Sequence, residues 1–203
     1  METIIPRHSE PSAWDSGQES AWIAASQAGD TAAFNRLVLK WERKIYNLSL
    51  RMLRNPEDAS DSTQEIFLLA FRHIRKFRGN SLFSTWLYRI AVNHCFDIIK
   101  RRPADYQMEN PGQDERGHLK YSSPGNLQEK SILQSERQSR ILESLAVLPK
   151  DQRVVIELKF FQEETFNGIS SILDIPESTV KYRYYMALGF LKDHLGRFAE
   201  EIL

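Results

Sequence analysis

The spacing of apolar residues constrains the fold of this 203-residue chain more than any other feature. Between Phe34 and Leu53, apolar side chains recur at steps of three and four residues, the period of one face of an α-helix. The same spacing returns over most of the chain, whereas the alternation of polar and apolar residues that is typical of β-strands is scarce. We therefore expect an all-α protein.

Glycine, proline and capping residues divide this spacing into separate helices. In the first half we expect helices from near Glu19 to Ala28, from Thr31 as the cap to Leu53, from Glu57 to near Phe77, and from Ser84 or Thr85 to Arg102. Asn55-Pro56 ends the second of these. The third directs Phe71 inward and has Leu68 on its polar face. In the second half we expect helices over about 132–148, 150–161, 166–173 and 177–195. The last two are separated by the tight turn "DIPEST", and their spacing is that of a helix-turn-helix. Asp174 in this turn is a residue that a left-handed position can accept. On a helical wheel the packed face of the last helix includes Val180, Ala187 and Leu188.

A change of composition separates the two halves. Residues 103–130 contain three prolines and three glycines and show no apolar period, which is typical of a flexible linker. We expect two small helical domains, at 19–102 and 131–203, joined by this linker and preceded by a polar extension at 1–18.

Charge is distributed unevenly along the chain. With 27 basic and 27 acidic residues the net charge is zero. The stretch from Arg72 to Arg102, however, contains many lysines and arginines and only one acidic residue, Asp97. The segment after it is locally acidic. A local basic patch sets the field that a phosphate backbone experiences, so nucleic acid is a possible partner.

Several functional classes lack support in the sequence. No apolar run approaches the roughly 20 residues that span a bilayer, and the N-terminus has no secretion signal, so we expect a cytoplasmic protein. The lone cysteine, Cys95, excludes an internal disulfide, and no zinc-binding spacing occurs. His94 and Cys95 are adjacent on a helix and diverge by about 100°, so they form no nucleophile–base pair. We expect no enzyme activity, no cofactor and no metal.

The stretch "FRGNSLFSTWLYRIAVN" (77–93) combines cations, aromatics and a small polar turn. Aromatics beside cations can stack on unpaired bases, and the polar loop could read one extruded base. Aromatics at helical spacing also pack in cores, and this is the more frequent role of residues such as Phe77 and Trp86. The C-terminal helix pair has two interpretations as well, because packed helices with surface charges occur in any bundle.

Four segments together resemble bacterial RNA polymerase sigma factors of the extracytoplasmic function (ECF) type, which belong to group IV of the sigma-70 family. The segments are "AASQAGDTAAFNRLV", "NPEDASDSTQEIFLLAF", "FRGNSLFSTWLYRIAVN" and "LAVLPKDQRVVIELKF" followed by "ISSILDIPESTVKYR". They occur in the family's order and spacing, over roughly residues 20–102 and 135–195. The resemblance identifies the two expected domains with sigma region 2 and sigma region 4.

The resemblance also implies which residues bind which partner. Core RNA polymerase, through its β′ and β subunits, and promoter DNA are the implied partners. The D-x-x-Q-E pattern implies a polymerase-binding set: Asp61, Gln64 and Glu65. The loop and the helix after it imply a minus-ten set: Arg78, Gly79, Asn80, Ser81, Leu82, Trp86 and Arg89. The helix after the tight turn implies a minus-35 set: Ser178, Thr179, Lys181, Tyr182, Arg183, Tyr185 and Met186.

The implied function is transcription initiation, in which the protein directs polymerase to promoters and helps open the minus-ten DNA. The family commonly has an anti-sigma protein as a further partner. Where the family continues with arginines after the equivalent of Arg183, this chain has "YYMALGFLK", so we expect few phosphate contacts and low affinity for isolated DNA. Two other functions remain open: a polymerase-binding regulator without initiation activity, and a two-domain helix-turn-helix repressor.

Overall fold

The fold is described here from a computed structural model, which covers residues 16–102, 145 and 147–201. Within these ranges every regular element is helical, so the expected all-α class is confirmed. The first part contains α1 (Ser16–Gln27), α2 (Thr31–Leu53), α3 (Pro56–His73), a 3₁₀ turn η1 (Ile74–Lys76) and α4 (Phe83–Arg101). The second part contains α7 (Lys150–Ile156), a π-helical turn η2 (Glu157–Phe161), α8 (Phe166–Leu173) and α9 (Glu177–Glu201).

Local chemistry explains most helix boundaries, with one correction. The cap of α2 is Asp30 and not Thr31, because the Asp30 carboxylate accepts hydrogen bonds from the backbone N–H groups of Ala32 and Ala33 at 2.8 and 3.1 Å. Asn55 caps α3 in the same way, directly before Pro56. At the end of α8, Asp174 adopts the left-handed conformation (φ 54°), which confirms the expectation for this turn residue.

Two expectations about chain organisation are met only in part. The first helix starts at Ser16 and therefore includes the last residues of the expected extension at 1–18. The expected linker at 103–130 lies outside the described residues, as does most of the helix expected at about 132–148. Leu145 and Leu148 from that segment are described, and both are buried against Ile156 and Ala187. The division into domains stays a prediction.

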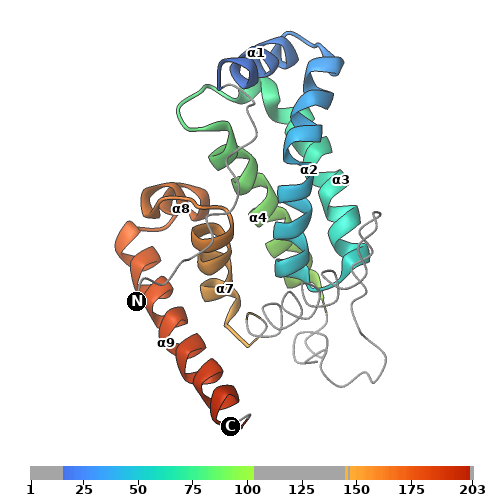
Figure 1. Cartoon of the computed structure of the whole chain (residues 1–203). Helices are drawn as coiled ribbons and strands as arrows, with labels where there is room; N and C mark the ends of the chain where they lie inside the picture. Colours follow the sequence, from blue (N-terminus) through green and yellow to red (C-terminus); the bar gives the residue numbers. More distant parts are fainter. Residues whose placement is uncertain (1–15, 103–144, 146, 202–203) are drawn as a thin grey trace, which may run out of the picture.

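The N-terminal helices form a bundle in which α2 and α3 lie side by side and α4 packs against both (Figure 1). Its core is built from the apolar faces that the three- and four-residue spacing predicts, including Leu37, Ile45, Ile66 and Leu87. One aromatic departs from the expectation. Phe71 was expected to point inward, but it lies at the edge of the bundle, 41% exposed, with its ring edge-on to that of Phe34.

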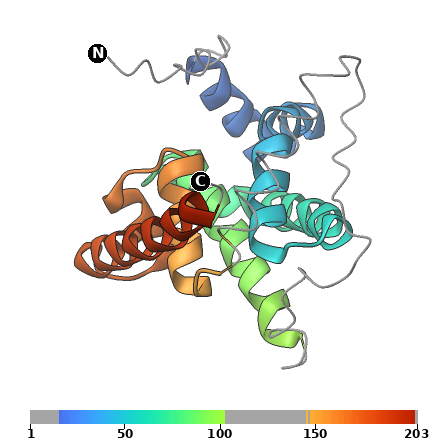
Figure 2. The same cartoon turned by 60° about the horizontal axis from the view of Figure 1, so that its bottom comes forward.

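The helices after residue 145 pack against the bundle instead of standing apart. In both views α4 lies between the α2–α3 pair and the C-terminal helices, and α8 contacts it directly (Figures 1 and 2). Val154, Leu158 and Ile169 belong to the same continuous apolar core as α2 and α4. The described chain is therefore in a closed arrangement, in which the two parts share buried surface.

A buried ion pair crosses this shared surface. Glu157, at the start of η2, is 1% exposed and accepts two hydrogen bonds from the guanidinium of Arg51 in α2, one of them at 2.8 Å. Gln162 donates to the same carboxylate at 2.9 Å and accepts from the Tyr88 hydroxyl at 2.8 Å. Burial raises the pKa of the Glu157 carboxyl, and the hydrogen bonds from Arg51 and Gln162 oppose that rise.

Replacing Arg51 alone should destabilise the protein strongly. Arg51→Met keeps an apolar contact with the Phe161 ring, over which the guanidinium lies at 4.3 Å, but leaves the Glu157 carboxylate buried without its cation. We expect the free energy of unfolding in urea to fall by about 3–5 kcal/mol. The double variant Arg51→Met, Glu157→Leu should recover most of this loss, because no unpaired charge then remains buried. A single variant as stable as the wild type would contradict this account.

Candidate nucleic-acid interface

The loop at residues 78–82 is an exposed part of the N-terminal bundle that carries predicted site residues. All five residues from Arg78 to Leu82 are exposed, and the Leu82 side chain is 72% exposed. Gly79 has φ +72°, a backbone conformation that residues other than glycine rarely adopt, so the chain turns at this point. The structure therefore brings together Arg78, Asn80, Ser81 and Leu82 as one accessible surface.

An aromatic cluster packs together the two ends of this loop. The rings of Phe77, Phe83 and Trp86 lie 5.3–5.8 Å apart between centroids, in tilted and edge-on pairs. Phe83 is buried, and Phe77 and Trp86 are half-buried. Trp86, placed in the minus-ten set, thus has a packing role in this arrangement, and its contact with DNA stays a prediction.

Two cations of the expected basic patch contact other parts of the protein. Arg89, also in the minus-ten set, donates from its guanidinium to the backbone carbonyl of Ser171 in α8. Arg102 pairs with Asp58 and donates to the carbonyl of Leu53 at 3.0 Å. In the closed arrangement Arg89 is therefore directed to α8, apart from the 78–82 loop that it was expected to assist.

The predicted polymerase-binding residues share one exposed face of α3. Asp61, Gln64 and Glu65 are all exposed, and the same face continues into the partly exposed apolar side chains of Leu68 and Phe71. The sequence pattern placed Leu68 on this face, and the burial confirms that position. The mixture of carboxylates with apolar side chains suits a protein partner that supplies both cations and apolar contacts.

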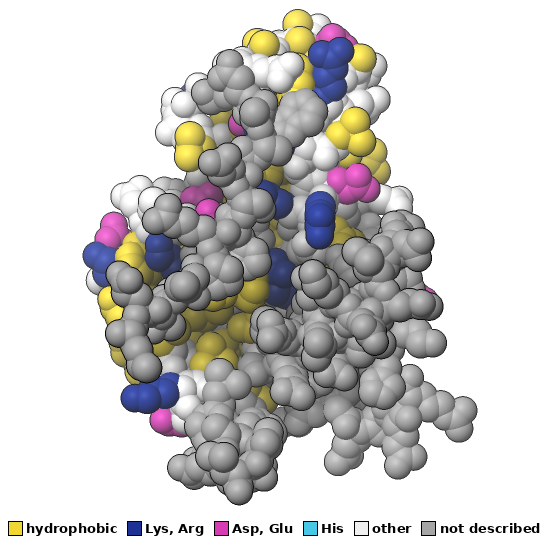
Figure 3. Space-filling view, viewed as in Figure 1, with side chains coloured by type: hydrophobic (Ala, Val, Ile, Leu, Met, Phe, Trp, Pro, Cys, Tyr) yellow, Lys and Arg dark blue, Asp and Glu magenta, His cyan; other side chains and the backbone are white. Residues whose placement is uncertain are grey.

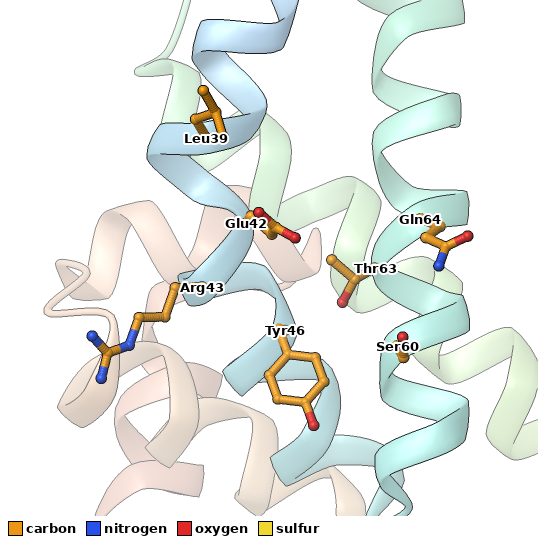
Figure 4. Close-up of a pocket in the computed structure, with 7 residues that line it drawn as sticks. All are labelled: Leu39, Glu42, Arg43, Tyr46, Ser60, Thr63 and Gln64. Atoms are coloured by element: carbon orange, nitrogen blue, oxygen red, sulfur yellow. The ribbon is translucent and has the colours of Figure 1, made fainter. Parts of the chain in front are cut away.

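A hollow of about 310 Å³ lies beside this face, between α2 and α3. Figure 4 shows that Leu39, Glu42, Arg43 and Tyr46 line it from α2, and Ser60, Thr63 and Gln64 from α3. Leu39 is 77% exposed, although it is apolar. Sequence reasoning did not single out the α2 residues. Their signal was available, because Leu39 lies off the apolar face that contains Leu37 and Trp41.

The outward face of α9 is aromatic. Tyr182 and Tyr185 are 64% and 63% exposed, Met186 is 48% exposed, and Ser178 and Lys181 are exposed beside them. The opposite face packs through Val180 and Ala187, as the helical wheel predicts. Leu188, expected on the packed face, is 40% exposed. Apolar side chains gather over the α7–α9 side of the molecule, next to lysines and arginines (Figure 3).

Three of the predicted minus-35 residues are held by neighbouring groups or partly covered. Arg183 is half-buried and pairs with Asp151 of α7 at 3.1 Å, so this cation also fixes α9 against α7. Lys181 pairs with Glu177 one turn earlier, at 2.6 Å. Thr179 is half-buried. The exposed apolar contact area of this set thus comes from the two tyrosines and Met186.

We also searched the part of the chain that the structure describes for a metal site, a membrane-spanning helix and a reactive thiol. Among these residues no group of three or more His, Cys, Asp or Glu side chains could hold a metal ion. None of the helices described is both long and apolar enough to cross a bilayer. Cys95 is fully buried and its thiol lies 3.8 Å from the Ser49 hydroxyl oxygen.

The Cys95 thiol should be unreactive in the native protein. Burial raises the pKa of this thiol to about 12, so at pH 8 the nucleophilic thiolate is far rarer than for a free cysteine with a pKa of about 8.5. We expect labelling by a disulfide reagent to be at least about 100-fold slower than in urea, where the thiol is exposed. Rapid stoichiometric labelling of the folded protein would contradict this prediction.

Comparison with known proteins agrees with this architecture. Residues 37–103 match the family described as Sigma-70 region 2, and residues 138–191 match the family described as Sigma-70, region 4. The ECF RNA polymerase sigma factor SigW of Bacillus subtilis is 37% identical over 176 residues, which cover 85% of this chain and 94% of SigW. The RNA polymerase sigma-H factor of Pseudomonas aeruginosa is 34% identical over 177 residues, which cover 84% and 90% of the two chains.

Solved structures share the fold. CnrH, in complex with the cytosolic domain of CnrY, superposes with a TM-score of 0.67 at 19% identity, covering 89% of this chain and 98% of CnrH. The sigma factor RpoE of Bartonella quintana, in complex with the anti-sigma factor NepR, gives a TM-score of 0.61 at 19% identity, covering 80% of this chain and 96% of RpoE.

Proposed function

This chain belongs to the extracytoplasmic function (ECF) family of RNA polymerase sigma factors, and on that premise we propose how its two helical regions divide the work of promoter recognition. It is a transcription initiation factor that directs RNA polymerase. The relatives do not favour the alternative of a regulator or repressor without initiation activity. The family is not known for enzymes. We assign region 2 to residues 19–102, the linker to 103–130 and region 4 to 131–203.

The 78–82 loop is the surface that we propose for opening the minus-ten DNA. The observation that carries this role is the combination of an exposed polar loop with a rigid aromatic support beneath it. A base that leaves the duplex loses stacking and pairing worth a few kcal/mol, and a preformed pocket can offset that cost. Asn80 and Ser81 supply hydrogen-bonding groups and Leu82 supplies apolar contact. Arg78 faces the phosphate backbone of the DNA.

The other two surfaces take the remaining partners in this proposal. The exposed face of α3 with Asp61, Gln64 and Glu65 binds core polymerase, together with Leu68 and Phe71 beside it. The outward face of α9 reads the minus-35 element. Because Tyr182, Tyr185 and Met186 supply most of its presented area, it makes few phosphate contacts, and the protein alone binds DNA weakly.

The closed arrangement adds a second reason for weak binding by the free protein. Arg89, one of the proposed minus-ten residues, is engaged with the Ser171 carbonyl of α8, the first helix of the helix-turn-helix. DNA that used Arg89 would have to break this hydrogen bond, which links α4 to α8. We therefore propose that region 4 moves away from region 2 when the protein assembles with polymerase, in the cytoplasm.

An anti-sigma protein is a further proposed partner. CnrH and RpoE of B. quintana were solved in complexes, the latter with a protein named as an anti-sigma factor. The exposed apolar side chains of α9 offer a surface of the composition that such a protein could cover, since contiguous apolar groups on a surface favour protein partners.

Run-off transcription with purified core polymerase tests the function directly. Fragmented genomic DNA serves as the template, and the transcripts are sequenced to recover both promoter elements. We expect defined start sites that depend on this protein. Core polymerase that initiates equally without the protein, or at no promoter with it, would overturn the proposal.

Asn80→Ala tests the role of the loop. Loss of the amide should lower open-complex formation by about tenfold, the effect of roughly 1.4 kcal/mol of hydrogen bonding, while leaving the affinity for core polymerase unchanged. Permanganate reactivity of minus-ten thymines reports the opening, and fluorescence anisotropy reports polymerase binding. Asn93→Ala is the matched control, because Asn93 is an exposed asparagine on α4 outside the loop. Unchanged opening by the Asn80 variant would assign the loop a different role.

A further inference from the structure

We propose that Gln27, the last residue of α1, is a positioning residue that holds the start of the 78–82 loop in the conformation used for opening DNA. This inference rests on the proposed function of that loop. Gln27 precedes residue 37, where the match to Sigma-70 region 2 begins. It also belongs to none of the residue sets that the sequence patterns assign.

The side-chain amide of Gln27 bridges the carbonyl of the first residue of η1 and that of the residue directly after η1. Its nitrogen donates to the carbonyl of Ile74 at 3.1 Å and to that of Phe77 at 2.6 Å. A primary amide has two N–H groups, so both can be used on backbone that lies about 50 residues further along the chain. Phe77 is the last residue before the exposed loop, so the bridge fixes the point at which the loop leaves the bundle.

The backbone that follows Gln27 is held by hydrogen bonds and by the cap of the next helix. The turn that ends α1 is closed by hydrogen bonds from Ala28 to Ala24, from Gly29 to Ser26 and from Asp30 to Ala25, at 3.0–3.1 Å. Asp30 then caps α2 directly. Gly29 has φ +102°, and the guanidinium of Arg75 in η1 lies 3.6 Å from where a Cβ on this glycine would stand. The donor is therefore mounted on ordered backbone that lies against η1.

The far end of the loop has a separate anchor. Phe83, the first residue of α4, is buried against the rings of Phe77 and Trp86. Ring packing leaves the peptide planes at the loop entrance free to rotate, whereas two hydrogen bonds to carbonyls three residues apart fix their directions. A binding site that must hold a base needs its backbone placed to within about 0.5 Å, so this restraint acts on function more than on folding.

The bridged carbonyls do not require Gln27 for their own satisfaction. The Ile74 carbonyl already accepts the N–H of Phe77 at 3.0 Å, and the bonds from Gln27 are only partly buried. Water can replace a donor at a partly buried carbonyl. Loss of the amide should therefore have little effect on global stability and a larger effect on the loop.

Three variants test this role in the full-length protein. Gln27→Met keeps the length and helix propensity of the side chain but removes both donors, and Gln27→Lys retains a donor. Gln18→Met makes the same change at an exposed glutamine earlier in α1. Hydrogen exchange of the Phe77 amide, which donates to the Ile74 carbonyl at 3.0 Å, reports the loop entrance without any need for transcription. Permanganate reactivity with core polymerase reports promoter opening.

We expect Gln27→Met to accelerate exchange of the Phe77 amide and to lower open-complex formation by about tenfold, with unchanged affinity for core polymerase. Gln27→Lys should restore much of the opening, and Gln18→Met should resemble the wild type in both measurements. Unchanged exchange in Gln27→Met, or faster exchange with normal opening, would overturn the positioning role. A wild type that opens no promoter would overturn the proposed function, and hydrogen exchange would still decide whether the bridge restrains the loop.

Discussion

The ion pair between Arg51 of α2 and Glu157 at the start of η2 sets how η2 is oriented against α2 in the closed arrangement. A carboxylate that is 1% exposed has lost its water, and that loss is tolerable only if a cation and further donors take the place of the solvent. Arg51 and Gln162 supply those donors, so η2 must lie against α2 in a fixed orientation. The position of η2 in turn determines where α8 meets α4, because only a short turn separates η2 from α8 in sequence.

This constraint also brings α4 into contact with the C-terminal helices, through Tyr88 and through Arg89, which we propose for DNA. Tyr88 is buried and donates to Gln162, and the neighbouring Arg89 donates to α8. Under the proposed assignment of Arg89 to DNA, its hydrogen bond to α8 would have to break before Arg89 contacts a promoter. Separation exposes apolar core residues of the C-terminal helices, including Leu158 and Ile169, so an alternative partner must compensate for the lost burial. Binding to polymerase could provide that compensation, which links the stability of the closed form to the control of promoter binding.

The three proposed surfaces differ in chemistry because their partners differ. The α3 face presents carboxylates beside Leu68 and Phe71, which suits a protein and repels a phosphate backbone. The 78–82 loop presents small polar groups on a rigid aromatic base, which suits a single extruded base. The α9 face presents tyrosines and a methionine, which favour contact with base edges over charge neutralisation. Their separation on different helices allows each partner to be engaged at its own step.

The sequence by itself determined the elements that local chemistry controls. The three- and four-residue spacing identified the helices, the Asn55-Pro56 pair marked the α2–α3 boundary, and the turn at Asp174 was anticipated from its tolerance of the left-handed conformation. The exposure of Asp61, Gln64 and Glu65 also follows from the spacing on one helix. The resemblance of short motifs to the family identified the function, since residue types at fixed separations within a helix or loop can be compared without a tertiary structure.

The tertiary structure alone decided which of these side chains are available. The pairing of Arg51 with Glu157 joins residues 106 positions apart, and the bonds from Gln27 to Ile74 and Phe77 and from Arg89 to Ser171 are similarly remote. Helical periodicity gives the direction of a side chain from its own helix but not the neighbour it meets. For this reason it placed Phe71 inside, whereas packing left Phe71 partly exposed. It also gave no sign that Arg89 donates a hydrogen bond to α8.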